Sequence, residues 1–170
     1  MLQPVTTPRD NGKRTLKAVK VGAGQDRFGA ALQIAEWRFD CKISGKDTAG
    51  AYCVFDTIRT AKGGPPLHVH HDQDEWFFVR DGEYVFKVGD ETFYLKAGDS
   101  LLGPRKVPHA FASLTEKSAM MILFQPAGDM EQLFFDVSQL AKSRQPTPED
   151  WRTLGSWRGV DIIGPPLAFG

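Results

Sequence analysis

The sequence predicts an all-β fold, a closed barrel or jelly roll that carries an N-terminal arm and C-terminal helices. Short apolar and β-branched runs recur between residues 37 and 125, and Gly- and Pro-containing breaks separate them as turns separate strands. Helical periodicity appears only beyond residue 128. We expect a single domain over 1–170, with an arm over 1–27, a barrel over 37–125 and a helical segment and tail over 129–170.

The strands of the expected barrel follow one another at short intervals. Residues 37–43 alternate apolar and polar side chains, which is typical of a strand with one buried face. Residues 51–58 form a second apolar run, and Gly63-Gly64-Pro65-Pro66 ends it before another strand begins at Leu67. Further strands are expected over 75–80, 83–88, 92–95, 100–103, 110–114 and 119–125.

One turn makes a definite prediction about pairing. Asp81-Gly82 lies between two strand-like runs and is typical of a two-residue type I′ hairpin turn. In that hairpin Phe77 faces Phe86 and Glu75 faces Val88, so Glu75 shares a face with aromatic side chains.

Two helices are expected after the barrel. The first begins at Asp129, capped with Gln132, and its apolar stripe packs across the barrel. The second begins after Thr147 with Pro148 in the first turn and ends at Gly155, and an apolar tail follows over 160–169.

Composition narrows the classes of partner. Lys plus Arg and Asp plus Glu both number 21, so the chain lacks the positive charge of proteins that bind nucleic acids or anionic membranes. No apolar run has the length of a membrane span or a secretory signal, which predicts a cytoplasmic protein with a small-molecule partner. Cys41 and Cys53 form no C-x-x-C pair and are expected to be buried free thiols.

Three of the four histidines lie in one short run, His68-Val69-His70-His71. Alternation along a strand places His68 and His70 on one face and turns His71 to the other, where we expect it to be exposed. With Glu75 and His109 they make a plausible nitrogen and oxygen ligand set for one divalent transition metal. The alternative is a set of structural histidines in a barrel without metal.

The spacing around these residues resembles the first motif of the cupin family, Gly, five residues, His-x-His, three or four residues, Glu, six residues, Gly. Here His68 and His70 are followed by Glu75 after four residues and by Gly82 after six more. The leading glycine, Gly63, lies one position closer than usual.

The second cupin motif, Gly, five residues, Pro-x-Gly-x-x-His-x-x-x-Asn, is matched at Gly98, Pro104 and His109. Lys106 stands where glycine is expected and Ser113 replaces asparagine, which puts loop conformation in doubt rather than ligation. All four ligand positions match. The resemblance implies the cupin double-stranded β-helix, a jelly-roll barrel, with a metal ion held by His68, His70, Glu75 and His109.

Within the cupins, Gly63 to His71, Asp74 to Phe77 and Val107 to Phe111 are similar to bacterial single-domain proteins described as quercetin 2,3-dioxygenase-like. This resemblance implies oxygenolysis of a flavonol-like or other small enolic or aromatic substrate by dioxygen, with Glu75 as the catalytic base. Burial of Glu75 is expected to raise its pKa toward the range useful for a base. The metal is iron, manganese, nickel, cobalt or copper, and zinc is possible.

Two other functions fit the same residues. One is a non-enzymatic cupin that binds a small ligand, and the other is a cupin isomerase acting on a phosphorylated sugar. The isomerase needs a basic cluster at the barrel mouth, for which the candidates are Arg59, Lys62, Arg105 and Lys106.

Aromatic residues supply the last two predictions. Phe77, Tyr84, Phe86 and Phe111 are candidates for the walls of a substrate pocket, with filling of the barrel core as the alternative. Trp76 and Phe78 alternate with the inward positions and make the opposite face apolar, which predicts a homodimer.

Overall fold

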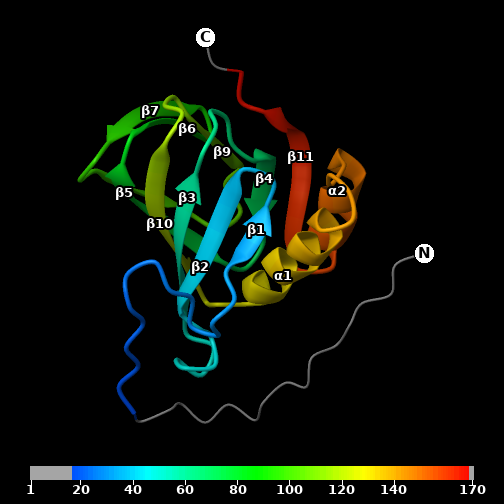
Figure 1. The fold of residues 1–170 in the computed structure, drawn as a ribbon. Coiled ribbons are helices and arrows are strands. Elements are labelled where there is room, and N and C mark those ends of the chain that lie inside the picture. The colour runs from blue at the N-terminus through cyan, green and yellow to red at the C-terminus, as the bar shows by residue number, and fades with distance from the viewer. Residues whose placement is uncertain (1–16, 169–170) are drawn as a thin grey trace.

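The computed structural model describes residues 17–168, which form two antiparallel sheets facing each other (Figure 1). The six-stranded sheet has the order β1-β2-β3-β10-β5-β8 and the five-stranded sheet the order β11-β4-β9-β6-β7. The prediction of an all-β jelly roll is confirmed. The strands are β1 (Leu32–Ile34), β2 (Trp37–Ile43), β3 (Cys53–Arg59), β4 (Pro66–His70), β5 (Asp74–Asp81), β6 (Glu83–Val88), β7 (Glu91–Lys96), β8 (Ser100–Gly103), β9 (His109–Ser113), β10 (Ser118–Gln125) and β11 (Val160–Pro166).

The core between the sheets consists mainly of aromatic side chains. Strand β5 shows how it is built, because Glu75, Phe77 and Val79 are buried while the intervening side chains point outward. The ring centroids of Phe77 and Phe86 lie 4.9 Å apart, and Phe86 also packs against Phe111 at 5.1 Å. Full burial of one such ring contributes about 1.5–3 kcal/mol to folding.

The predicted hairpin at Asp81-Gly82 is wrong. Strand β5 pairs with β10 and β8, whereas β6 pairs with β7 and β9, so the chain crosses between sheets at this point. Phe77 and Phe86 therefore meet across the core instead of as neighbours in one ladder. Gly82 has φ +80°, and a Cβ there would lie 2.5 Å from Thr115 Oγ1, so glycine is required for the close crossing.

The two helices are α1 (Met130–Ala141) and α2 (Pro148–Ser156), and they lie on the side of the barrel occupied by β1 and β11 (Figure 1). Of the predicted stripe, helix α1 buries Met130, Leu133, Phe134 and Val137, whereas its fifth member, Leu140, is only partly buried. Its N-cap residue, Asp129, makes no side-chain capping bond, so the capping interaction predicted with Gln132 is not formed.

Helix α2 begins as predicted but ends differently. Gly155 lies inside the helix rather than at its end. Glycine is needed there because a Cβ would come 2.6 Å from the carbonyl oxygen of Val160. A left-handed glycine follows four residues later, at Gly159 with φ +77°. The apolar tail beyond it is strand β11, which pairs with β4 and places Ile162 opposite His68.

The interactions at the start of α2 make the stability of this helix depend on pH. Thr147 and Asp150 form a capping box, and Arg144 pairs with the Asp150 carboxylate at 2.6 Å. The Arg144 and Thr147 hydrogen bonds hold the pKa of Asp150 below its usual 3.8. Stability from this carboxylate is therefore complete above about pH 4 and declines as the pH falls through the lower folded-state pKa.

We expect the fluorescence of Trp151, in the same turn, to report loosening of α2 as the pH falls from about 4 to 2. In Asp150→Asn this part of the transition should be absent, because no carboxylate titrates there. Identical pH curves for the two proteins would contradict the assignment.

The N-terminal region of the described structure lies alongside β2. Residues 1–16 of the predicted arm lie outside the described residues, whereas Arg27 N donates to Cys41 O at 2.8 Å and the Arg27 side chain pairs with Asp47. Cys41 and Cys53 are buried free thiols, as predicted. Within 17–168 no helix is long and apolar enough to cross a membrane.

Candidate metal centre

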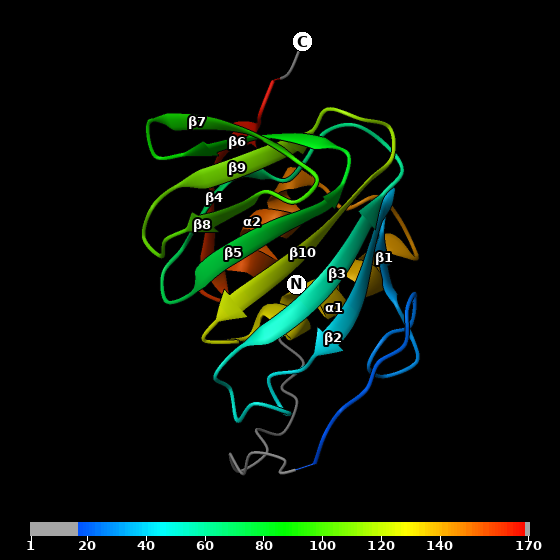
Figure 2. The same cartoon turned by 90° about the vertical axis from the view of Figure 1, so that its left-hand side faces the viewer.

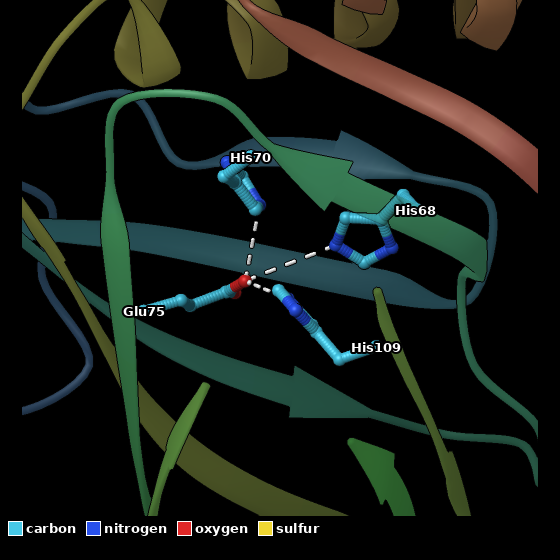
Figure 3. A group of neighbouring side chains, drawn as sticks. All are labelled: His68, His70, Glu75 and His109. Carbon is cyan, nitrogen blue, oxygen red and sulfur yellow. Dashed lines mark hydrogen bonds and ion pairs between the residues drawn. The ribbon is translucent and has the colours of Figure 1, made fainter. Parts of the chain in front are cut away.

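Four buried side chains converge between the two sheets (Figure 3). His68 and His70 come from β4, His109 comes from β9, and Glu75 reaches them from β5 in the opposite sheet. The Oε2 atom of Glu75 lies 2.8 Å from His109 Nε2, 3.1 Å from His70 Nε2 and 3.8 Å from His68 Nε2. One ligand atom from each residue lies within 4.8 Å of all the others.

Strand geometry explains this convergence. His68 and His109 are directly opposite each other in the β4–β9 pair, and His70 shares the face of His68 because it is two residues further along β4. His71 points the other way, is exposed as predicted, and pairs with Asp161 at 2.8 Å.

Backbone carbonyls orient two of the imidazoles. His68 Nδ1 lies 2.8 Å from Pro66 O, and His109 Nδ1 lies 3.0 Å from Val107 O. Each Nδ1–H can donate to its carbonyl, which directs Nε2 to the centre of the cluster, as outer-shell bonds do for metal-binding histidines. His70 Nδ1 has no such partner in the part of the chain that is described.

The electrostatics of the cluster differ from the sequence-based expectation for Glu75. Burial acts to raise the Glu75 pKa, but hydrogen bonds with His109, His68 and His70 outweigh it and hold the pKa well below its usual value. The expected rise in the pKa is therefore wrong, because the expectation considered burial without the imidazoles. Glu75 is ionised at neutral pH.

The pKa values of His68 and His109 shift in opposite directions. Burial lowers the pKa of His68. Burial also acts to lower the pKa of His109, but its hydrogen bond to Glu75 outweighs this and raises the pKa. A metal ion bound at His109 Nε2 has to displace the proton that this hydrogen bond holds.

The cluster fits a metal ion. Three imidazole nitrogens and one carboxylate oxygen form a ligand set that divalent iron, manganese, cobalt, nickel, copper and zinc accept. Buried polar groups of this kind need partners, and the four residues together could hold a metal ion that supplies them.

Two departures from the cupin motifs flank His109, with Lys106 in the loop before β9 and Ser113 at the end of β9. Lys106 has φ +65°, a left-handed conformation that explains why glycine is expected there, and its N–H donates to His70 O at 2.7 Å. Gly63 and Ser113 form a two-way backbone bridge at 3.0 and 2.9 Å, which ties the first motif to the end of the second. Both substitutions leave the ligands in place.

An apolar pocket adjoins the cluster. Glu75, His68 and His70 form one part of its wall, and side chains from β2, α1 and α2 form much of the rest, among them Trp37, Phe134 and Trp151. The cavity is narrow, about 50 Å³, whereas pockets for drug-sized ligands measure roughly 300–1,000 Å³. A ring-sized ligand therefore requires outward movement of covering side chains.

The aromatic candidates for this pocket separate into two groups. Phe111 lines it, whereas Phe77, Tyr84 and Phe86 are fully buried in the core and do not contribute to its wall. The apolar stripe predicted that α1 packs across the barrel, but no local pattern showed that α1, α2 and β11 form walls of this pocket.

The basic residues considered for an anion site do not reach the pocket. Arg59 stacks on the Trp37 ring at 4.6 Å and donates to the carbonyls of Ala61 and Lys62. Arg105 forms a two-bond pair with Asp74. None of Arg59, Lys62, Arg105 and Lys106 lines the pocket.

Comparison with known proteins agrees with this geometry. Residues 57–125 match the family described as "Cupin domain", and this segment includes all four residues of the cluster. The chain carries a cupin domain. The match extends from β3 to the end of β10, and β11 and the helices that cover the pocket lie outside it.

One curated relative is an enzyme. Over 55 residues the chain is 44% identical to 3-hydroxyanthranilate 3,4-dioxygenase of Xanthomonas euvesicatoria pv. vesicatoria (strain 85-10). The match covers 28% of this cupin chain and 31% of the relative, so it spans about a third of that enzyme's length.

Solved structures show the same fold. An RmlC-like cupin from Shewanella frigidimarina NCIMB 400 has a TM-score of 0.53 at 18% identity, over 65% of this chain and 92% of that one. KdgF from Halomonas sp. has a TM-score of 0.52 at 15% identity, over 60% and 92%. At these identities the likeness concerns the fold alone.

Proposed function

We propose that this cupin is a metal-dependent dioxygenase acting on a flavonol-like or other small enolic or aromatic substrate. One observation carries the proposal: three imidazole nitrogens face one carboxylate oxygen, and three of these four residues, His68, His70 and Glu75, line an apolar pocket. The partial match to a curated dioxygenase supports the same reaction class.

Each residue has a role in this proposal. His68, His70, Glu75 and His109 hold the metal, whose chemistry when bound is to acidify a coordinated substrate hydroxyl and to support reaction with dioxygen. Glu75 supplies the carboxylate of the cluster and accepts the hydroxyl proton. Phe111 and the apolar walls from α1 and α2 exclude water from the reacting ring.

The test begins with elemental analysis of protein purified without chelator or affinity metal, followed by oxygen-uptake assays on flavonols and single-ring enols. Near-stoichiometric iron, manganese, nickel, cobalt or copper together with oxygen uptake would support the dioxygenase. Ligand binding without turnover, whichever metal is loaded, would instead support the non-enzymatic binding cupin. Absence of metal after reconstitution would exclude both the proposed metal centre and the reaction.

The isomerase is less well supported. Recognition of a phosphorylated sugar requires cationic side chains at the site, and the pocket wall has none among residues 17–168.

We also propose a homodimer that forms through the outer face of the six-stranded sheet. Strands β8, β5 and β10 lie side by side there (Figure 2), and the Trp76 and Phe78 rings stack at 6.0 Å. Leu102 lies opposite Trp76 on β8 and is 53% exposed, so this apolar face has no cover within the described chain. A second copy supplies a flat, self-complementary surface of matching chemistry.

Leu102→Glu is expected to reduce the mass in solution from two chains to one chain of 18.9 kDa, because it places a charge in the apolar contact. Light scattering after gel filtration measures this. Tyr94→Glu is the matched control, since Tyr94 is 76% exposed on β7 in the other sheet. A wild-type protein with the mass of one chain would contradict the dimer.

The proposed compartment is the cytoplasm. Support comes from Cys41 and Cys53, which are both free and buried, since thiols persist where glutathione and thioredoxin keep them reduced.

A further inference from the structure

The wall of the pocket contains few polar atoms apart from the metal cluster. Among residues 17–168, its other side chains are aliphatic or aromatic, and the only ones with a nitrogen or oxygen are the indoles of Trp37 and Trp151. Trp37 is 9% exposed, and its Nε1–H has no hydrogen-bond partner in the described structure. A buried donor without a partner is rare in folded proteins and needs an explanation.

Trp37 and the metal cluster occupy different levels of the barrel. Across the six-stranded sheet Trp37 is level with Arg59 and Ser118, whereas Glu75 is level with Phe124, six residues further along β10. The Trp37 ring packs against Phe39 at 4.7 Å and against Phe111 at 5.5 Å. A ligand that contacts both Trp37 and Glu75 therefore extends along the pocket.

The surroundings of Trp37 favour a neutral acceptor. The Arg59 guanidinium lies 4.6 Å from the ring centroid, and a cation over the ring draws electron density from the indole and strengthens its N–H as a donor. Arg59 itself does not line the pocket and is occupied by backbone carbonyls. An anionic group at this end would lose its hydration without gaining a hydrogen-bonded cationic partner, since Arg59 donates to the Ala61 and Lys62 carbonyls.

We propose that Trp37 is a specificity-determining residue, whose indole N–H donates to a neutral oxygen of an uncharged, flat ligand at the end of the pocket away from the metal cluster. This inference rests on the proposed function for the position of the ligand's reacting hydroxyl. The class of substrate it names is an apolar ring with a carbonyl, ether or hydroxyl oxygen opposite that hydroxyl. Ligands with a carboxylate at the same place are excluded.

Three catechols test this with zinc-loaded protein, in which binding is measured without turnover. Each has two hydroxyls for the metal end, and the opposite substituent is a neutral acceptor in 4-acetylcatechol, an apolar group in 4-ethylcatechol and an anion in 3,4-dihydroxybenzoate. Isothermal titration calorimetry is carried out on wild type, Trp37→Phe and the control Trp157→Phe. Trp157 is partly exposed after α2 and does not line the pocket.

Wild type is expected to bind 4-acetylcatechol most tightly and 3,4-dihydroxybenzoate most weakly. In Trp37→Phe the preference for 4-acetylcatechol over 4-ethylcatechol should fall by about threefold to tenfold, as for the loss of one neutral hydrogen bond. The ratio should be unchanged in Trp157→Phe. Because the ratio is compared between proteins, the electronic effect of each substituent on the catechol cancels.

Equal losses for both neutral ligands in Trp37→Phe would overturn the role of the indole N–H, and tight binding of 3,4-dihydroxybenzoate would overturn the exclusion of anions. Absence of binding by all three would contradict the proposed class. If Trp37→Phe does not fold, Trp37→Leu takes its place in the same comparison, and a ratio of the two neutral ligands equal to that of wild type contradicts the donor. A dioxygenase assay can fail while this preference is observed, so the two proposals are separable.

Discussion

His68→Ala is expected to lower the metal affinity by at least about 100-fold, because it removes one of four proposed ligands from a closely spaced set. His68 also faces His109 directly across the β4–β9 pair, so its loss opens the cluster on one side. Elemental analysis after dialysis, together with metal titration of the stripped protein, measures the effect.

The matched control for this variant is His71→Ala. His71 is three residues from His68 along the same segment, but it is exposed and pairs with Asp161 outside the cluster. It should retain the wild-type metal content. Equal metal content in wild type, His68→Ala and a His68→Ala, His109→Ala double variant would show that bound metal lies elsewhere.

Glu75→Gln is expected to reduce kcat by about 100-fold to 10,000-fold, the range for loss of a general base. The glutamine has nearly the same shape and still offers one oxygen toward the cluster, but it cannot accept the proton of a substrate hydroxyl. Because the Glu75 pKa lies well below its usual value, the wild-type carboxylate is ionised across the neutral range. Oxygen uptake at matched metal occupancy measures the change.

Metal occupancy has to be determined for each Glu75 sample, since glutamine also weakens ligation. Glu91→Gln serves as control, because Glu91 is an exposed carboxylate on β7 and has no contact with the cluster. A metal-loaded Glu75→Gln protein with wild-type kcat would exclude Glu75 as the base and leave it only the role of a ligand.

Local pattern was sufficient to predict most strands and two residues of the cluster that share a face of β4. The expected ranges 37–43, 83–88 and 100–103 coincide with β2, β6 and β8, because alternation and the adjoining Gly or Pro residues define a strand within its own sequence. Spacing along β4 likewise places His68 and His70 on one face, since the alternation of side chains is a property of any extended chain.

Pairing could not be predicted in the same way. Asp81-Gly82 has the composition of a hairpin turn, yet it connects two different sheets, because β5 is already bonded to β10 and β8 on its two edges. That outcome depends on residues 118–125 and 100–103, which a local turn preference cannot include. The shared burial of Phe77 and Phe86 was still foreseen, since both point to the core in either arrangement.

The sequence by itself determined the types of the four clustered residues, the spacing of His68, His70 and Glu75, and the alternating inner face, because these depend on neighbours within a few residues. Only the tertiary structure decided what surrounds them. It set the Glu75 pKa below its usual value by bringing three imidazoles from two other strands to one oxygen, where burial alone would have raised it. It also placed α1, α2 and β11 over the pocket that Trp37 lines, and it left the Trp37 Nε1–H without a partner among the described residues, because contacts between distant segments follow from how the two sheets close.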